Sequence, residues 1–230
     1  MQIQPIAHFV SPFPDKFGIP KQSGLVEELR GEIVFESQYR NPEALRGMED
    51  FDFLWLIWGF SANKHAATNA TVRPPLLGGN ERVGVFASRS PFRPNGLGLS
   101  SVRITGLELD TPRGPIIHVA GADLMNGTPI YDIKPYVAYA DSHPDVRSGF
   151  VDSHPIKRLD VEIPDDVASV FPPDDLEALR KVLALDPRPH YHDDASKVYG
   201  MFYASYNVRF MVDGNKLVVK DIKKSLSNNG

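Results

Sequence analysis

The chain has 230 residues, 20 prolines, 18 glycines, no cysteine and a formal net charge of −4 at pH 7. The lack of cysteine excludes disulfides, thiolate catalysis and zinc held by cysteine, and the mild negative charge argues against a uniformly basic nucleic-acid binder. Proline and glycine at this frequency favour a turn-rich all-β or α+β fold. No apolar run reaches membrane-spanning length, so we expect a soluble cytoplasmic protein.

The N-terminal half reads as a series of short strands. We expect strands at residues 3–10, 29–35, 51–60, 83–87, 100–109 and 116–119. Asn41-Pro42 should open a short helix toward Met48, because asparagine caps a helix and proline fits its first turn. Trp55 and Trp58 lie in a segment that is apolar on both faces, which predicts core positions. Short strands at such spacing are typical of a barrel or a sandwich.

The composition shifts near residue 140. A short strand is expected at 159–163, and Pro172-Pro173-Asp174 should open a helix that runs to about Leu185. Asp213-Gly214 is a hairpin signal between strands at 198–212 and 216–222. The chain is therefore expected to be mainly β, with a β domain at 1–140 and a small α+β C-terminal domain at 141–230.

The stretch from Thr71 to Ser100 combines prolines and glycines with four arginines: Arg73, Arg82, Arg89 and Arg93. Proline stiffens the backbone, glycine allows close approach to a ligand, and arginine presents a planar fork of donors. Such a loop suits an anionic or planar ligand, although composition alone favours a turn-rich linker with solvated arginines. Residues 72–103 carry five arginines and one acidic residue, so a local positive face is expected.

Two further segments carry charged pairs. Asp132 and Lys134 alternate with apolar neighbours and would project to one side of a strand, where a buried ion pair is the simplest interpretation. In Asp186-Pro187-Arg188-Pro189, the prolines stiffen the backbone around an arginine, and the plain alternative is a helix stop with an exposed Arg188. The loop at 123–129 offers backbone donors and acceptors that could read an adenine edge.

Several catalytic classes find little support in the sequence. His190 and His192 alternate as metal ligands can on a strand, but no HExxH motif or acidic cluster accompanies them, so scattered surface and loop histidines are favoured and no metal is expected. The chain has no GxSxG, no P-loop lysine and no GxGxxG between a strand and a helix. Serine-hydrolase, ATP-dependent and Rossmann-type chemistry are therefore disfavoured.

Taken together, these segments resemble the TsaA-like family and, more closely, its TrmO branch of S-adenosylmethionine-dependent tRNA N6-methyltransferases. The matching pieces keep the family order over nearly the whole chain. They are Ser11-Pro12, Phe17, Pro20-Lys21-Gln22, Arg46-Gly47, 71–75, 77–80, 84–87, Arg89-Ser90, 92–95, 123–124, 127–129, 132–136 and 186–189. The last of these marks the tRNA-modifying branch.

The resemblance implies a TsaA-like β-barrel methyltransferase domain, a homodimer, and methylation of N6-threonylcarbamoyladenosine at position 37 beside the tRNA anticodon. The cofactor would be S-adenosylmethionine. Its contacts would fall on Gln22, Ser23, Gly24, Phe60, Ser61, Arg89, Leu99, Asp123, Leu124, Met125 and Asn126. The family often has aspartate where Asn126 stands and proline where Gly96 stands; backbone contacts tolerate both changes, whereas a side-chain contact from Asn126 would not.

Candidate catalytic and tRNA-binding residues follow as hypotheses from the chemistry of the implied reaction. The acceptor nitrogen must lose a proton, which makes Asp132 and Asp186 the candidate proton acceptors, with Lys134 beside them. Arg73, Arg93 and Arg188 would contact phosphates or the threonylcarbamoyl carboxylate, and Tyr136 and Tyr191 would stack on bases of the anticodon arm.

Three alternatives stay open: a non-catalytic RNA-binding module, a methyltransferase of the same fold with another acceptor, and a metal hydrolase that uses the histidines. Retained S-adenosylmethionine binding separates the RNA-binding module from a methyltransferase, and bound metal would mark the hydrolase.

Overall fold

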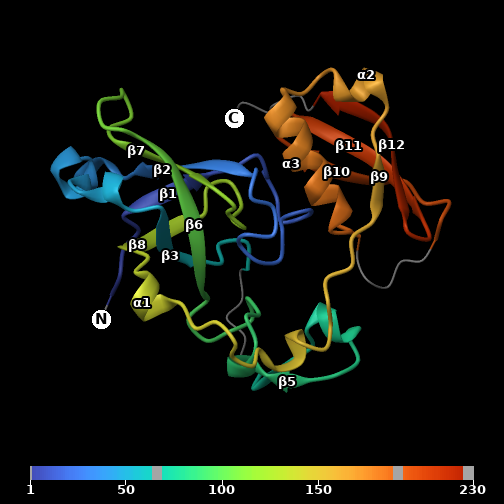
Figure 1. Ribbon diagram of the computed structural model, residues 1–230, viewed down its shortest axis with the longest axis horizontal. Coiled ribbons are helices and arrows are strands. Elements are labelled where there is room, and N and C mark those ends of the chain that lie inside the picture. The colour runs from blue at the N-terminus through green and yellow to red at the C-terminus, as the bar shows by residue number, and fades with distance from the viewer. Residues whose placement is uncertain (1, 64–68, 189–193, 225–230) are drawn as a thin grey trace.

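The computed structural model describes residues 2–63, 69–188 and 194–224. Six antiparallel strands close into a ring in the order β1-β2-β7-β6-β3-β8 (Figure 1). Their bounds are β1 (Ala7–Val10), β2 (Arg30–Phe35), β3 (Phe53–Gly59), β6 (Leu97–Glu108), β7 (Ile116–Ala120) and β8 (Pro129–Pro135).

The ring encloses one of the two hydrophobic cores. Alternate side chains of each strand point inward, as the two-residue period of a strand requires. The fully buried ones include Phe9, Ile33, Leu54, Leu56 and Ile117. This alternation agrees with the strands expected in the N-terminal half, and Trp58 is buried as expected while Trp55, on the other face of β3, is only half-buried.

The second core lies between a four-stranded sheet and one helix, drawn on the right of Figure 1. The sheet has the order β10-β11-β12-β9, and only β9 runs parallel to its neighbour. Its strands are β10 (Tyr199–Tyr203), β11 (Tyr206–Asp213), β12 (Lys216–Lys224) and β9 (Asp160–Glu162). The helix α3 (Pro173–Ala184) buries Leu179, Val182 and Leu183 against this sheet.

The remaining elements are short. A two-stranded sheet pairs β4 (Thr71–Val72) with β5 (Val83–Gly84). Two single-turn helices are α1 (Ala138–Asp141) and α2 (Asp165–Ala168). Turns of 3₁₀ helix occur at Ser37–Tyr39, Pro42–Leu45, Met48–Asp50, Pro75–Leu77, Val85–Ala87 and Gly149–Val151. None of the helices in the described part of the chain is long and apolar enough to cross a membrane.

The mainly β fold, the helix after Pro172 and the hairpin at Asp213-Gly214 are confirmed. Three expected elements are wrong in detail. The strand expected at 198–212 is two strands, because Ala204 adopts a left-handed conformation (φ 53°) and turns the chain. The strand expected at 83–87 ends after Gly84 in a 3₁₀ turn, and the helix expected from Asn41 is a pair of 3₁₀ turns.

Residues 11–29, which connect β1 to β2, form a strap that leaves the ring and reaches the second core; it is drawn in blue between the two sheets in Figure 1. Phe13, Val26 and Leu29 of this strap are buried among side chains of α3 and of β10–β12. The domain division at residue 140 stays a prediction, and the structure adds that the N-terminal strap packs within the core of the C-terminal part.

Candidate functional site

The segments expected to hold the cofactor meet at one end of the ring. Strand pairing places the end of β3 beside the starts of β6 and β8, and the start of β2 beside the end of β7. The loops at this end are the strap, residues 60–61 after β3, the arginine-containing stretch before β6, and residues 121–128 between β7 and β8. The predicted cofactor residues lie on these loops or, for Leu99, near the start of β6.

The strap and the arginine stretch touch through one hydrogen bond. The Arg89 guanidinium donates from Nη1 to Oε1 of Gln22 over 2.5 Å, and the Gln22 amide donates from Nε2 to the carbonyl of Lys21 over 2.6 Å. The side chain of Gln22 is thereby oriented by both partners. Because Arg89 is exposed and its fork has five donors, it retains N–H groups for an anionic ligand.

Behind this contact lies a buried hydrogen-bonded relay. The indole Nε1 of Trp58 donates to Oγ of Ser100 over 2.9 Å, and Ser100 Oγ donates to Oδ1 of Asp123 over 2.6 Å. The direction of the relay is fixed, because an indole N–H can only donate and so directs the single hydroxyl hydrogen of Ser100 to the carboxylate. Ser100 is 1% exposed, which shields this bond from water.

Burial raises the pKa of Asp123 above its ordinary value, since a low-dielectric environment disfavours the charged carboxylate. The hydrogen bond from Ser100, the charge of Arg89 and a hydrogen bond from the Ser23 backbone all oppose this rise in pKa. The interactions that Asp123 makes therefore connect three of the four loops. Gly24 adds a further link, because its N–H donates to the carbonyl of Gly121 over 2.8 Å.

The other predicted cofactor residues divide into exposed and structural positions. Phe60 packs edge-on against Trp58 at 4.4 Å between ring centroids, Ser61 is exposed, and Leu99 is 55% exposed. Leu124 is buried in the ring core, which leaves only its backbone for a ligand.

Asn126 ties the strap to the loop at 121–128. Its N–H donates to the carbonyl of Phe13 over 2.8 Å, and its Oδ1 accepts from the Ser11 N–H over 3.2 Å. The side-chain oxygen is therefore used within the protein at the position where the family often has aspartate. Met125, the preceding residue, accepts a hydrogen bond from Thr128 through its carbonyl.

Asp132 and Lys134 form the expected ion pair, with 3.0 Å between Oδ2 and Nζ. The pair is not buried, which corrects the expectation: the two side chains are 45% and 63% exposed. Both lie on β8, and the strand register places Asp132 opposite Ile57, three residues before Phe60. Asp132 is thus at the same end of β3 as the predicted cofactor residues.

Asp186 and Arg188 form a two-pronged ion pair. Nε and Nη2 of Arg188 donate to Oδ1 and Oδ2 of Asp186, each over 2.9 Å. Arg188 is only 11% exposed, so the alternative of a solvated arginine is wrong. Asp186 also attracts Lys21, whose pKa is lowered by loss of water around its ammonium group and partly restored by that attraction. Asp186 therefore lies near the residue that precedes Gln22.

The remaining tRNA-binding candidates differ in availability. Arg73 is exposed, whereas Arg93 is half-buried and donates from Nη1 to the Ser88 carbonyl over 3.2 Å. Tyr136 is half-buried and packs on Trp55 at 5.7 Å between ring centroids. Tyr191, like His190 and His192, lies outside the described residues. Among the residues that the structure does describe, no three histidine, aspartate or glutamate side chains group as metal ligands would.

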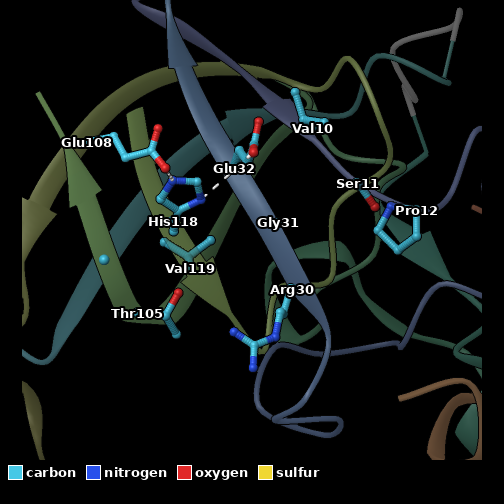
Figure 2. Close-up of a pocket in the computed structure, with 11 residues that line it drawn as sticks. Val10, Ser11, Pro12, Arg30, Gly31, Glu32, Thr105, Glu108, His118 and Val119 are labelled. Carbon is cyan, nitrogen blue, oxygen red and sulfur yellow. Dashed lines mark ion pairs between the residues drawn. The ribbon is translucent and has the colours of Figure 1, made fainter. Parts of the chain in front are cut away.

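A pocket of about 600 Å³ lies beside the strap, on the β2–β7–β6 face of the ring. Figure 2 shows His118 between the carboxylates of Glu108 and Glu32, at nitrogen–oxygen distances of 3.1 Å and 3.8 Å. Ser11 and Pro12, at the start of the strap, line another side. None of the predicted cofactor or tRNA residues that the structure describes lines this pocket, so its volume does not identify the functional site.

The sequence did not point to Ser100 or Lys21 as functional residues, or to Trp58 as more than a core residue. A serine at an inward-facing position of a strand is the signal for Ser100, and it becomes visible only when the strand register is known. The assembled site offers a half-buried carboxylate, an exposed guanidinium and an aromatic ring within one cluster of loops.

Two family models match the chain: the tRNA-methyltransferase O N-terminal domain over residues 8–142 and the TrmO C-terminal domain over residues 159–225. A tRNA (adenine(37)-N6)-methyltransferase of Escherichia coli K12 is 36% identical over 92% of this chain and 93% of its own length. A protein of the same name from Eikenella corrodens is 38% identical over 75% of this chain and 97% of its own. A crystal structure of TrmO from Pseudomonas aeruginosa superimposes with a TM-score of 0.77 at 30% identity, covering 97% of this chain and 98% of that one.

Proposed function

The chain belongs to the TrmO family of tRNA (adenine(37)-N6)-methyltransferases, and from this premise we propose that it uses S-adenosylmethionine to methylate N6 of threonylcarbamoyladenosine at position 37 of tRNA. The observation that carries the proposal is the convergence of Gln22, Ser23, Arg89 and Asp123 on one end of the strand ring. In this proposal, a TsaA-like β-barrel domain at 1–140 binds the cofactor. The domain at 141–230 contributes to tRNA binding.

The chemistry of these side chains fits the cofactor. S-adenosylmethionine, when bound, supplies a methyl group on a cationic sulfur, and it also carries an amine, a carboxylate, ribose hydroxyls and adenine. A carboxylate such as Asp123 suits hydroxyl or amine groups, the Arg89 guanidinium suits a carboxylate, and the edge-packed Phe60 offers a face for a cation. The backbone of the loop at Leu124 and Met125 would read the adenine edge.

A bound acceptor would need positioning more than activation by a strong base, because methyl transfer from a sulfonium is an in-line displacement. Of the two candidate proton acceptors, Asp132 is the better placed. Its carboxylate is half-exposed and lies on β8 opposite Ile57 of β3, whereas both oxygens of Asp186 accept hydrogen bonds from Arg188. We therefore propose that Asp132 accepts the proton, with Lys134 as its ion-pair partner. Asp186 would instead position Lys21.

For the tRNA, the exposed Arg73 is the best candidate for a phosphate contact, and Arg93 and Arg188 would contribute after release from their present partners. Tyr136 could stack on a base only through the face that Trp55 leaves open. A homodimer and a cytoplasmic location remain part of the proposal on the resemblance alone, as does a stacking role for Tyr191.

The test is methyl transfer from labelled S-adenosylmethionine to two tRNA preparations that differ only in threonylcarbamoyladenosine at position 37. Label confined to the modified tRNA supports the proposal. Cofactor binding without label in either preparation directs the search to another acceptor. A protein that binds tRNA but no cofactor is the RNA-binding module instead, and activity that is lost with a chelator and restored by metal would support the hydrolase alternative.

A Lys or Ala variant of Arg89 sharpens this experiment. Arg89→Ala removes the guanidinium from the site, whereas Arg82→Ala removes an exposed arginine from the same stretch of chain and serves as the control. We expect S-adenosylmethionine affinity to fall only in the Arg89 variants, with Lys restoring part of it because a lysine keeps the charge but not the fork.

A further inference from the structure

The strap holds three predicted cofactor residues between two stretches that are packed in the other core. Before Gln22, the side chain of Phe13 is fully buried and meets the ring of Tyr203 edge-on at 5.6 Å between centroids. After Gly24, Val26 and Leu29 are buried against the same cluster as Leu183 of α3. The cofactor segment is therefore supported on both sides by the C-terminal part of the chain.

Gly18 makes the closest of these contacts. It has a left-handed backbone (φ 90°), and a Cβ at this position would lie 2.1 Å from Sδ and 2.7 Å from Cγ of Met201 in β10. Met201 is fully buried, so a displaced thioether would have to move among the side chains of the second core. Met201 fills the space that a side chain at position 18 would need, and glycine suits both this space and the left-handed backbone.

Polar contacts add to this packing. The Ala204 N–H, in the turn between β10 and β11, donates to the carbonyl of Pro12 over 2.7 Å. Arg158 donates to the carbonyl of Leu25 over 3.2 Å, and Lys181 of α3 forms an ion pair with Glu28. These contacts flank the cofactor segment on the sequence and none of them involves a residue assigned to the cofactor.

We infer that the C-terminal core positions the wall of the cofactor site, so that Gly18, Met201 and Phe13 act as positioning residues for S-adenosylmethionine although none of them contacts it. The cofactor segment contacts the other loops at this end of the ring through three hydrogen bonds. They join Gln22 to Arg89, Ser23 to Asp123 and Gly24 to Gly121. If the packing of the strap on the C-terminal core changes, these three residues move away from their hydrogen-bond partners. Binding of the cofactor and order in the C-terminal core are then coupled, and the coupling must act in both directions.

The inference rests on the proposed function for the identity of the ligand, and it is tested by calorimetric binding of S-adenosylmethionine rather than by methyl transfer. Gly18→Ala should weaken the affinity roughly tenfold. This is the loss expected if the strap adopts its binding-competent conformation in only about one molecule in ten. The matched control is Gly47→Ala, which imposes a similar left-handed backbone (φ 83°) in the turn before Met48 but has no atom within 4 Å of its Cβ. The control should bind within about twofold of the unaltered protein.

A double variant separates displacement from general loss of stability. Met201→Ala removes the atoms that a Cβ at Gly18 would meet, so Gly18→Ala with Met201→Ala should bind more tightly than Gly18→Ala alone. A general destabilisation would instead make the double variant the weaker binder. Equal affinity of Gly18→Ala and the unaltered protein, or a double variant weaker than Gly18→Ala, overturns the inference.

Hydrogen exchange on the unaltered protein keeps the test decisive if the variants do not fold. Saturating S-adenosylmethionine should slow exchange of the Ala204 amide, which bonds to the strap, while amides near Gly214 should change little. Unchanged exchange at Ala204 in a protein that binds the cofactor overturns the inference and leaves the proposed function intact. A protein that binds no S-adenosylmethionine overturns both.

Discussion

The hydroxyl of Ser100 donates a 2.6 Å hydrogen bond to the carboxylate of Asp123, and its direction is imposed by the indole of Trp58 behind it. Asp123 is therefore held with one oxygen committed to the protein. Backbone hydrogen bonds from Asp123 itself and from Ser23 also hold the carboxylate, which has about four lone-pair sites and so keeps acceptor capacity for a ligand. A fixed acceptor of this kind is what recognition of hydroxyl or amine groups requires, because the side chain is already ordered before the ligand binds.

Replacing Ser100 by alanine should lower both the stability and the cofactor affinity of the protein, because it removes the hydrogen bonds that join Trp58, Ser100 and Asp123. The change leaves the buried Trp58 N–H without its acceptor and should lower the free energy of unfolding by about 1–3 kcal/mol. It should also weaken S-adenosylmethionine binding, since Asp123 is then free to rotate. Ser101→Ala is the control, because Ser101 is on the same strand but on the opposite face, and we expect a change below about 0.5 kcal/mol. Urea titration and calorimetry measure the two effects, and a Ser100→Ala protein that matches the control in both would contradict the relay.

The raised pKa of Asp123 predicts a pH dependence of stability with a definite sign. Burial lets the folded protein retain this proton where the unfolded chain has lost it, so the contribution of Asp123 to stability falls as pH rises. The fall begins at about pH 3.9, the ordinary value for aspartate, and ends above the raised folded value.

Asp123→Asn does not titrate and isolates this effect. The free energy of unfolding of the variant minus that of the unaltered protein should increase with pH over this window and then become constant. Urea denaturation of both proteins at a series of pH values gives this difference. A difference that stays flat or decreases would mean that the folded protein stabilises the ionised carboxylate instead.

Much of the fold follows from local sequence patterns. The spacing of Leu179, Val182 and Leu183 predicts one apolar face of a helix, and all three are buried in α3. Asp213-Gly214 predicts the β11–β12 hairpin because its backbone preferences match a tight turn. In contrast, the turn at Ala204 has no such signal, since alanine in a left-handed conformation is imposed by the surrounding strands.

The path of the strap could not be predicted from the sequence. Phe13, Val26 and Leu29 read as core residues in either domain, and nothing periodic connects them with partners more than 100 residues away. The exposure of the Asp132–Lys134 pair and the burial of Arg188 were missed for the same reason. Alternation fixes which side of a strand a residue takes, whereas packing of distant segments decides whether that side is covered.

Gly98 should be intolerant of any side chain. It pairs with Trp58 across β3 and β6, and an added Cβ would lie 2.4 Å from the indole. Gly98→Ala must therefore displace the ring and with it the bond to Ser100, at a cost of about 1–3 kcal/mol in the free energy of unfolding. Gly84→Ala, with open space around its Cβ, should cost less than about 0.5 kcal/mol. Tryptophan fluorescence during urea unfolding reports both, and equal midpoints would contradict the close approach of the two strands.

The two candidate proton acceptors should respond differently to amide substitution. Asp132→Asn breaks an exposed ion pair and should change the free energy of unfolding by less than about 1 kcal/mol. Asp186→Asn removes the negative charge opposite the guanidinium of Arg188, which is 11% exposed, and should cost about 1.5–3 kcal/mol. Asparagine tolerates the left-handed backbone at residue 186 (φ 52°), so this cost reflects the lost charge rather than strain.

The same pair of variants then tests the assignment of roles. If Asp132 accepts the proton, Asp132→Asn should lower kcat by roughly a hundredfold at unchanged stability and cofactor affinity. Asp186→Asn should act mainly through stability and through the position of Lys21, so its activity should recover when S-adenosylmethionine and tRNA are raised to saturation. Single-turnover rates at saturating tRNA distinguish these outcomes. A normal rate for Asp132→Asn together with a slow, non-recoverable Asp186→Asn would assign proton acceptance to Asp186, and normal rates for both would exclude either carboxylate as the base.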